Sequence, residues 1–139
     1  MSSVTVLIGE QGSAKSTITA VVRRLVDPIR VDPLKEVLLH SSTQPDLLAR
    51  AKDSRLITME NISDVPAWLS DGICTLATGA GDSRHRNFSD GDEVTLNASR
   101  PVVLNGIGNF ITRDDLRDRA VMIECSPIGP FQRKDEASF

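Results

Sequence analysis

Gly9-Glu10-Gln11-Gly12-Ser13-Ala14-Lys15-Ser16 is the stretch that decides the fold. It follows an apolar run, Val4-Thr5-Val6-Leu7-Ile8, and precedes a helical pattern. A strand, a loop of small residues and a helix form an arrangement that cradles phosphates, because N–H groups of the loop and helix N-terminus point at the anion. In such a loop the Lys15 side chain reaches the terminal phosphates and the Ser16 hydroxyl can ligate Mg²⁺.

The loop departs at one position from the pattern G-x-x-x-x-G-K-[ST], because Ala14 replaces the second glycine. Alanine adds a methyl group where the backbone lies close to phosphate, and it tolerates positive φ less well than glycine. If φ is negative at Ala14, as helix entry allows, the change is mild. A chance turn before a helix is the alternative, but the flanking strand and helix are the context that the motif requires.

Length and composition indicate one soluble domain, which we expect over residues 1–131, followed by a polar, disordered tail over 132–139. A net charge of −3 argues against non-specific coating of nucleic acid. Cys74 and Cys125 have no metal-ligand spacing and are expected to be reduced core thiols of a cytoplasmic protein. No apolar run approaches membrane-spanning length, and no signal peptide precedes the first strand.

Two stretches have the apolar period of amphipathic helices. The first is predicted to bury one stripe and to end before Asp27-Pro28. Its stripe consists of Ile18, Val21, Val22, Leu25 and Val26. The second is capped by Ser63 or Asp64, has Pro66 in its first turn and ends at the glycines after Thr78. Its stripe consists of Val65, Trp68, Leu69, Gly72, Ile73 and Leu76. Trp68 is expected in the core rather than as a base-stacking platform.

Shorter elements complete the pattern. A short strand is predicted over 34–40, and a helix from Thr43 with Leu47, Leu48 and Ala51 on its inner face. Near the end of the chain, we expect a buried strand over 101–106 and a last strand over 120–124. A short helix between them opens with the capping-box pattern Thr112-Arg113-Asp114-Asp115.

Arg55-Leu56-Ile57-Thr58-Met59-Glu60-Asn61 is the second informative stretch. A mostly apolar strand ending in a carboxylate is typical of a Walker B element, which holds Mg²⁺ or its water shell. Open α/β sheets place their ligands at this end of the strands. The signal is weak alone, and the phosphate loop upstream strengthens it.

Residues 83–97 read as a β-hairpin around Asp90-Gly91. Its first arm carries Arg84, His85 and Arg86, whereas its tip is acidic. The charges can belong to a solvated surface hairpin, or Arg84 and Arg86 can contact the phosphates of DNA. His85 is not a metal candidate, because His40 is the only other histidine and no cysteine clusters with either.

With both motifs placed, the chain resembles the AAA+ branch of P-loop ATPases, and in particular helicase-like ATP-binding proteins of phages and mobile elements, related to superfamily 3. Four strings carry this resemblance in the expected order. They are Gly9 to Thr17, Glu60-Asn61-Ile62-Ser63, Arg100-Pro101-Val102-Val103-Leu104-Asn105-Gly106-Ile107 and Thr112-Arg113-Asp114-Asp115-Leu116-Arg117-Asp118-Arg119-Ala120. The resemblance implies a three-layer α/β P-loop NTPase with a mostly parallel sheet and an inserted β-hairpin.

The resemblance also implies roles for single residues. ATP would be bound by Gly9, Glu10, Gln11, Gly12, Ser13, Ala14, Lys15, Ser16 and Thr17. Mg²⁺ would be held by Ser16 and Glu60, and Asn105 would orient water near the γ-phosphate. Arg119, with Arg113 as the weaker choice, would act as an arginine finger on the ATP of a neighbouring subunit. Asn61 stands where most such enzymes place a catalytic glutamate, and a neutral amide cannot accept a proton.

The expected function is therefore a Mg²⁺-ATP-binding, helicase-like ATPase core that acts on DNA within a homo-oligomeric ring, such as a hexamer. The chain stops before the helical lid that a full AAA+ module has, so a partner chain could supply it. A module that binds nucleotide without hydrolysis is the alternative, favoured by Asn61. A small-molecule kinase with the same loop is a third possibility, which Arg119 and Asn105 make a poorer fit.

Overall fold

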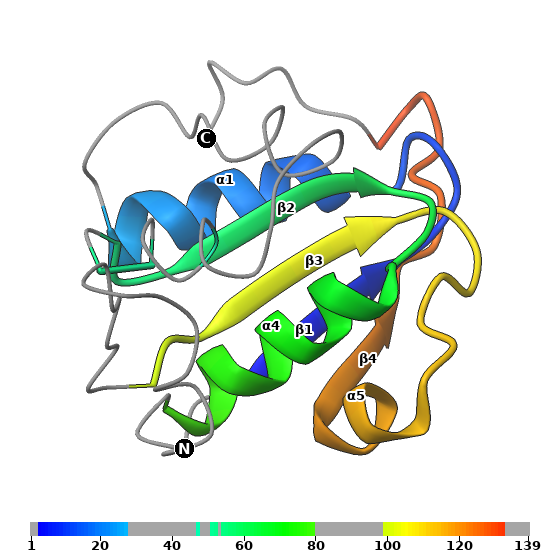
Figure 1. The fold of residues 1–139 in the computed structure, drawn as a ribbon. Helices are drawn as coiled ribbons and strands as arrows, with labels where there is room; N and C mark the ends of the chain where they lie inside the picture. The colour runs from blue at the N-terminus through cyan, green and yellow to red at the C-terminus, as the bar shows by residue number, and fades with distance from the viewer. Residues whose placement is uncertain (1–2, 28–46, 48–50, 53, 80–98, 133–139) are drawn as a thin grey trace, which may run out of the picture.

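The computed structural model describes residues 3–27, 47, 51–52, 54–79 and 99–132. These residues build a four-stranded sheet from β1 (Val4–Ile8), β2 (Ile57–Ile62), β3 (Val102–Gly106) and β4 (Ala120–Glu124). The strand order is β2-β3-β1-β4, and all three strand pairs are parallel. The protein is thus α/β with a parallel sheet, as predicted, and the carboxyl ends of its strands share one edge (Figure 1).

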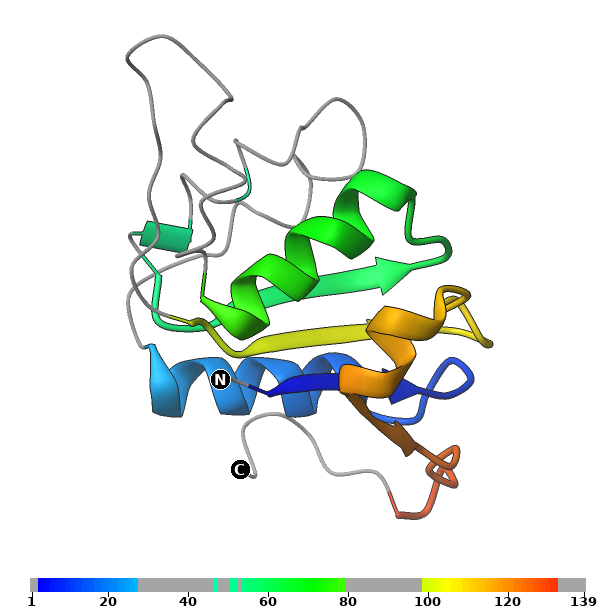
Figure 2. The same ribbon diagram turned by 60° about the horizontal axis from the view of Figure 1, so that its bottom comes forward.

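Helices lie on both faces of this sheet. α1 (Lys15–Val26) covers one face, whereas α4 (Ala67–Thr78) and α5 (Asp114–Arg119) lie on the other (Figures 1 and 2). Since side chains alternate along a strand, each strand contributes to both faces. Val4 and Val6 of β1 point into the α4 layer, and Leu7 belongs to the small cluster under α1.

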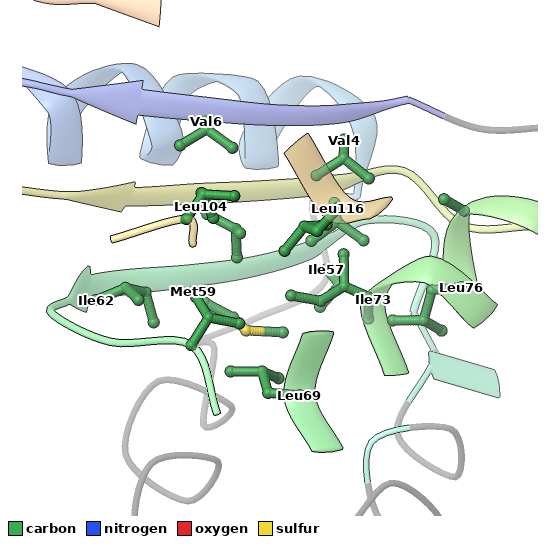
Figure 3. Packing of buried hydrophobic residues seen from close by; sticks show 14 of the residues in the cluster. Val4, Val6, Ile57, Met59, Ile62, Leu69, Ile73, Leu76, Leu104 and Leu116 are labelled. Atoms are coloured by element: carbon green, nitrogen blue, oxygen red, sulfur yellow. The ribbon is translucent and has the colours of Figure 1, made fainter. Parts of the chain in front are cut away.

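The main core lies between the sheet and α4 (Figure 3). Leu69, Ile73 and Leu76 of α4 are buried against β2 and β3, as their helical spacing predicts. Trp68 is half-buried against the same cluster, so its assignment to the core is confirmed. The helix ends at Thr78 and is followed by Gly79 at φ 84°, again as predicted.

The prediction for α1 is right about its bounds and wrong about its buried stripe. The helix ends at Val26, before Asp27, but the residues that it buries are Lys15 and Thr19. Ile18, Val21, Leu25 and Val26 are exposed, and Val22 is half-buried. The period of an apolar stripe identifies a helix, but it does not say which flank of that helix meets the sheet.

The predicted helix caps are also wrong. α4 begins at Ala67 after Pro66, and α5 begins at Asp114 after Arg113; neither has a side-chain cap hydrogen bond. β2 runs on to Ile62, beyond the predicted end of the strand at Asn61.

Several predicted elements lie outside the described residues. These are the strand over 34–40, most of the helix from Thr43, the hairpin over 83–97 and the tail after Gln132. Of the helix from Thr43, Leu47 and Ala51 are described as helical and fully buried, which fits their predicted inward position.

Candidate phosphate-binding loop and cavity

The loop between β1 and α1 turns through two left-handed residues. Gly12 has φ 83°, a conformation that glycine adopts at little cost. Ala14 has φ 60° and ψ 21° and directly precedes α1, where its carbonyl accepts the first helical bond from the Ile18 N–H at 2.9 Å. Replacement of glycine by alanine at position 14 would cost little only if φ were negative there, and φ is positive. The methyl group is therefore carried in a strained backbone conformation.

Lys15 is the first residue of α1, and its side chain folds back over the loop. Its Nζ donates hydrogen bonds to the Gly9 carbonyl at 2.6 Å, the Glu10 carbonyl at 2.8 Å and Ser13 Oγ at 3.0 Å. Ser13 Oγ in turn donates to the Glu10 carbonyl at 2.8 Å. These bonds use the three donors of the ammonium group and hold a nearly buried positive charge at the centre of the loop.

A cavity of about 430 Å³ opens beside this loop. Seven predicted ATP-binding residues and Asn61 belong to its wall. The remaining wall comes from residues that the sequence analysis did not assign to the site, at the ends of β2 and β3. The lining residues are Gln11, Gly12, Ser13, Ala14, Lys15, Ser16, Thr17, Asn61, Ile62, Ser63, Gly106 and Ile107. The sequence signal for Ile62, Ser63, Gly106 and Ile107 was their position at or directly after the carboxyl ends of apolar strands, where parallel sheets place ligands.

The end of β2 is irregular next to the cavity. Met59 pairs with Leu104 and Ile62 with Gly106, so two residues, Glu60 and Asn61, stand opposite Asn105 alone. This is a β-bulge, and Asn61 within it has φ 56°. The bulge brings Asn61 to the cavity wall, whereas Glu60 is half-buried and is not among the lining residues.

Asn105 is buried and hydrogen-bonded at both ends of its amide. Its Oδ1 accepts the Asn61 backbone N–H at 3.0 Å, and its Nδ2 donates to Thr19 Oγ1 at 3.0 Å. Thr19 Oγ1 donates to the Lys15 carbonyl at 2.9 Å. Asn105 thus lies behind the cavity wall, and Thr19 is a member of this network that the sequence analysis missed. A signal for Thr19 was available, since it lies one helical turn after Lys15.

The segment after β4 is hydrogen-bonded to the end of β1 and to the loop. The Cys125 N–H bonds to the Ile8 carbonyl at 2.6 Å, and the Ile128 N–H bonds to the Gly12 carbonyl at 3.0 Å. A Cβ at Gly9 would collide with Ser13 Oγ and the Cys125 carbonyl, which explains the need for glycine there.

The predicted arginine fingers lie away from this cavity. Arg119 is exposed at the amino end of β4, roughly 16 Å of strand from the carboxyl edge of the sheet. Arg113 is exposed and pairs with Asp71 at 3.3 Å and Asp115 at 3.7 Å. Arg84 and Arg86 fall outside the described residues.

The described ranges contain no group of three or more His, Cys, Asp or Glu side chains placed to hold a metal ion. Within the same ranges, no helix has the length and apolar character needed to cross a membrane. Cys74 and Cys125 are half-buried free thiols.

The fold and this cavity define an α/β protein with a buried lysine at the carboxyl edge of a parallel sheet. Comparison with family models identifies its relatives: residues 2–138 match the actinomycete integrative conjugative element replication protein family, and the chain belongs to it. It is therefore a replication-related protein of a mobile element, which is consistent with an action on DNA. A comparison with curated proteins finds no match.

The expected membership of the AAA+ helicase-like family is wrong, because the matching family is a different one and its match gives no evidence for a Walker A motif. The motifs behind that resemblance are short, and polar residues at the carboxyl ends of parallel strands recur in unrelated α/β proteins. The assignment to mobile elements was right.

Proposed function

We propose that this replication protein binds ATP with Mg²⁺ in the cavity beside the Gly9–Thr17 loop, in support of its action on DNA. The observation that carries the proposal is the position of Lys15. Its ammonium group is held within 3.0 Å of three loop oxygens and lies in the cavity wall. A triphosphate oxygen can take the place of Ser13 Oγ at one of these donors and leave the two carbonyl bonds intact.

Electrostatics favour an anionic ligand. Lys15, Ser16 and Thr17 form the first turn of α1, whose N–H groups have no partner within the helix and carry the positive end of its dipole. The first turn contains no acidic residue and no side-chain cap. None of the described lining residues is acidic, so Lys15 is the charged group of this wall.

The residues also fit a magnesium ion that accompanies the phosphates. Ser16 is exposed at the cavity and offers a hydroxyl oxygen, and Glu60, the expected second ligand, directly precedes the lining Asn61 but does not itself line the cavity. Mg²⁺ prefers oxygen ligands and usually keeps several waters, so one or two protein oxygens with the phosphates suffice. Bound there, the ion would neutralise phosphate charge.

Binding without turnover is the second candidate, because an amide rather than a carboxylate stands at Asn61. The described wall offers no general base to activate water. Measuring phosphate release with and without single-stranded DNA separates the candidates. ATP binding with no release at high protein concentration favours a regulatory nucleotide site.

Calorimetric titration of ATP, with and without Mg²⁺, tests the binding itself. We expect Lys15→Ala to weaken binding by roughly 10- to 150-fold, the range for a lost hydrogen bond to a charged group. Lys52→Ala is the matched control, since Lys52 is an exposed lysine away from the cavity. Equal affinities of wild type and Lys15→Ala would refute the proposal.

Assembly is part of the same proposal, because a neighbouring copy of this chain in a ring would offer its Arg119 to the ATP of this site. Size-exclusion chromatography with light scattering, with and without ATP and Mg²⁺, measures the oligomeric state directly. A monomer under both conditions would argue against a ring.

A further inference from the structure

We propose that Asn105 and Thr19 are positioning residues that hold Asn61 in the cavity wall and tie it to the start of α1. Neither Asn105 nor Thr19 lines the cavity. They act through Asn61, near the end of β2, and through Lys15, in the wall of the same cavity. The part that concerns ligand affinity rests on the proposed nucleotide site, whereas the part that concerns Asn61 does not.

The hydrogen bonds run in one direction from β2 to α1. The Asn61 N–H donates to Asn105 Oδ1, Asn105 Nδ2 donates to Thr19 Oγ1, and the Thr19 hydroxyl donates to the Lys15 carbonyl. Each of the two linking side chains therefore both accepts and donates. Bonds arranged in this way polarise one another, and loss of one weakens its neighbour.

Asn61 needs such support because of its backbone. A residue with φ 56° within a bulge has left the regular strand pairing, and asparagine enters this conformation at some cost. The Asn105 bond gives the displaced N–H a partner in place of a strand carbonyl. Without it, the bulge could relax toward regular pairing and withdraw Asn61 from the cavity.

Burial makes the arrangement specific. Asn105 is 1% exposed and Thr19 is 2% exposed, so neither can exchange its partner for water. An apolar side chain at position 19 would leave the Asn105 amide with an unsatisfied donor, and the amide would be expected to rotate or shift. A substitution at position 19 of α1 is therefore expected to change the environment of Asn61 in β2.

Amide hydrogen exchange measured by NMR tests this link in the full chain without any ligand. In Thr19→Val we expect the backbone N–H of Asn61 to exchange about tenfold faster than in wild type. This is the change expected for the loss of about one hydrogen bond. Thr19→Ser keeps the hydroxyl and should restore wild-type exchange. Val22→Ala loosens α1 packing without touching the network, and it should leave the Asn61 amide protected.

ATP titration of the same variants adds the functional readout. We expect weaker binding in Thr19→Val and wild-type binding in Thr19→Ser. Should Thr19→Val fail to fold, Thr19→Cys replaces it, because a thiol is a weaker partner than a hydroxyl.

The outcomes are separable. Unchanged Asn61 exchange in the position-19 variant, or equal acceleration in Val22→Ala, overturns the inference whether or not ATP binds. Faster exchange at Asn61 with unchanged ATP affinity overturns the part of the inference that concerns ligand affinity. If wild type binds no ATP but exchange follows the prediction, the proposed function fails and the positioning of Asn61 stands.

Discussion

α4 and α1 lie on opposite faces of the same sheet, yet they meet it through different side chains. α4 buries Leu69, Ile73 and Leu76 against the strands. α1 buries Lys15 and Thr19, and its Arg23 donates from Nη1 to the Leu56 carbonyl at 2.9 Å and Thr58 Oγ1 at 3.3 Å. One helix is held by apolar packing and the other largely by polar contacts.

This difference separates stability from the candidate site. Apolar burial is non-directional, so the α4 layer stabilises the sheet without fixing polar atoms. Polar contacts need defined geometry, and those of α1 place Lys15 and the loop at the cavity. Changes in α4 should therefore lower the free energy of unfolding, whereas changes in α1 should act on fewer, more local contacts.

The largest effect is expected from truncating α4. Ile73→Ala removes a fully buried side chain and should lower the free energy of unfolding by about 2–5 kcal/mol. Leu25→Ala is the matched control on α1, because Leu25 is 79% exposed; its effect should stay within about 0.5 kcal/mol. Urea unfolding followed by circular dichroism measures both. Similar losses in the two variants would mean that the helices do not differ as described.

Arg23 tests the polar attachment of α1. Arg23→Met keeps much of the aliphatic stem but removes the bonds to Leu56 and Thr58, at an expected cost of about 1–3 kcal/mol. Arg24→Met is the control, since Arg24 is exposed in the same last turn and loses the same favourable charge at the helix C-terminus. The two unfolding curves are compared at equal salt. An equal loss in Arg24→Met would assign the effect to the helix dipole instead.

The same contrast explains what the sequence could predict. The α4 layer was predictable because apolar period and strand alternation report burial directly, and the parallel sheet follows from alternating strands and helices. Lys15 and the loop were found because glycines and a Lys-Ser pair stand at a strand-to-helix junction. On α1 the apolar stripe predicted the wrong buried side, because polar residues occupy the side of the helix that faces the sheet.

The site details depend on tertiary geometry that no local pattern encodes. The β2 bulge arises from its pairing with β3, and it decides that Asn61 rather than Glu60 lines the cavity. The Asn105 bonds join β2, β3 and α1, which are far apart in the chain. The sequence does not fix the sign of φ at Ala14, and its positive value belongs to the turn that leads into Lys15, whose side chain folds back over the loop.

A substitution at Ala14 is expected to stabilise the protein, whereas those at Ile73 and Arg23 are expected to destabilise it. Ala14→Gly should raise the free energy of unfolding by roughly 1 kcal/mol or less, because relief of a left-handed alanine outweighs the greater freedom of glycine in the unfolded chain. Ala20→Gly is the control within α1, where glycine should destabilise by a similar amount. Thermal unfolding of both variants measures the difference. A lower melting temperature for Ala14→Gly would contradict the strained conformation.

The smallest effect concerns Cys74 of α4, which is half-buried against the main core. Burial, with smaller contributions from the Asp115 and Asp71 carboxylates, raises the pKa of the Cys74 thiol above its ordinary value of 9.0, although Arg119 and Arg113 oppose this. The folded protein thus binds this proton more tightly than the unfolded chain does. The resulting stabilisation is fully present below pH 9.0 and is lost as the pH rises through the raised pKa.

Comparing the pH dependence of unfolding in wild type and Cys74→Ala isolates this contribution, because other titrating groups cancel in the difference. Wild type should lose stability more steeply above pH 9.0 than Cys74→Ala does. Cys125→Ala should keep the steep loss, since it leaves Cys74 in place. If the steep loss persists in Cys74→Ala, the pH effect does not come from the Cys74 thiol, and it does not belong to the α4 layer.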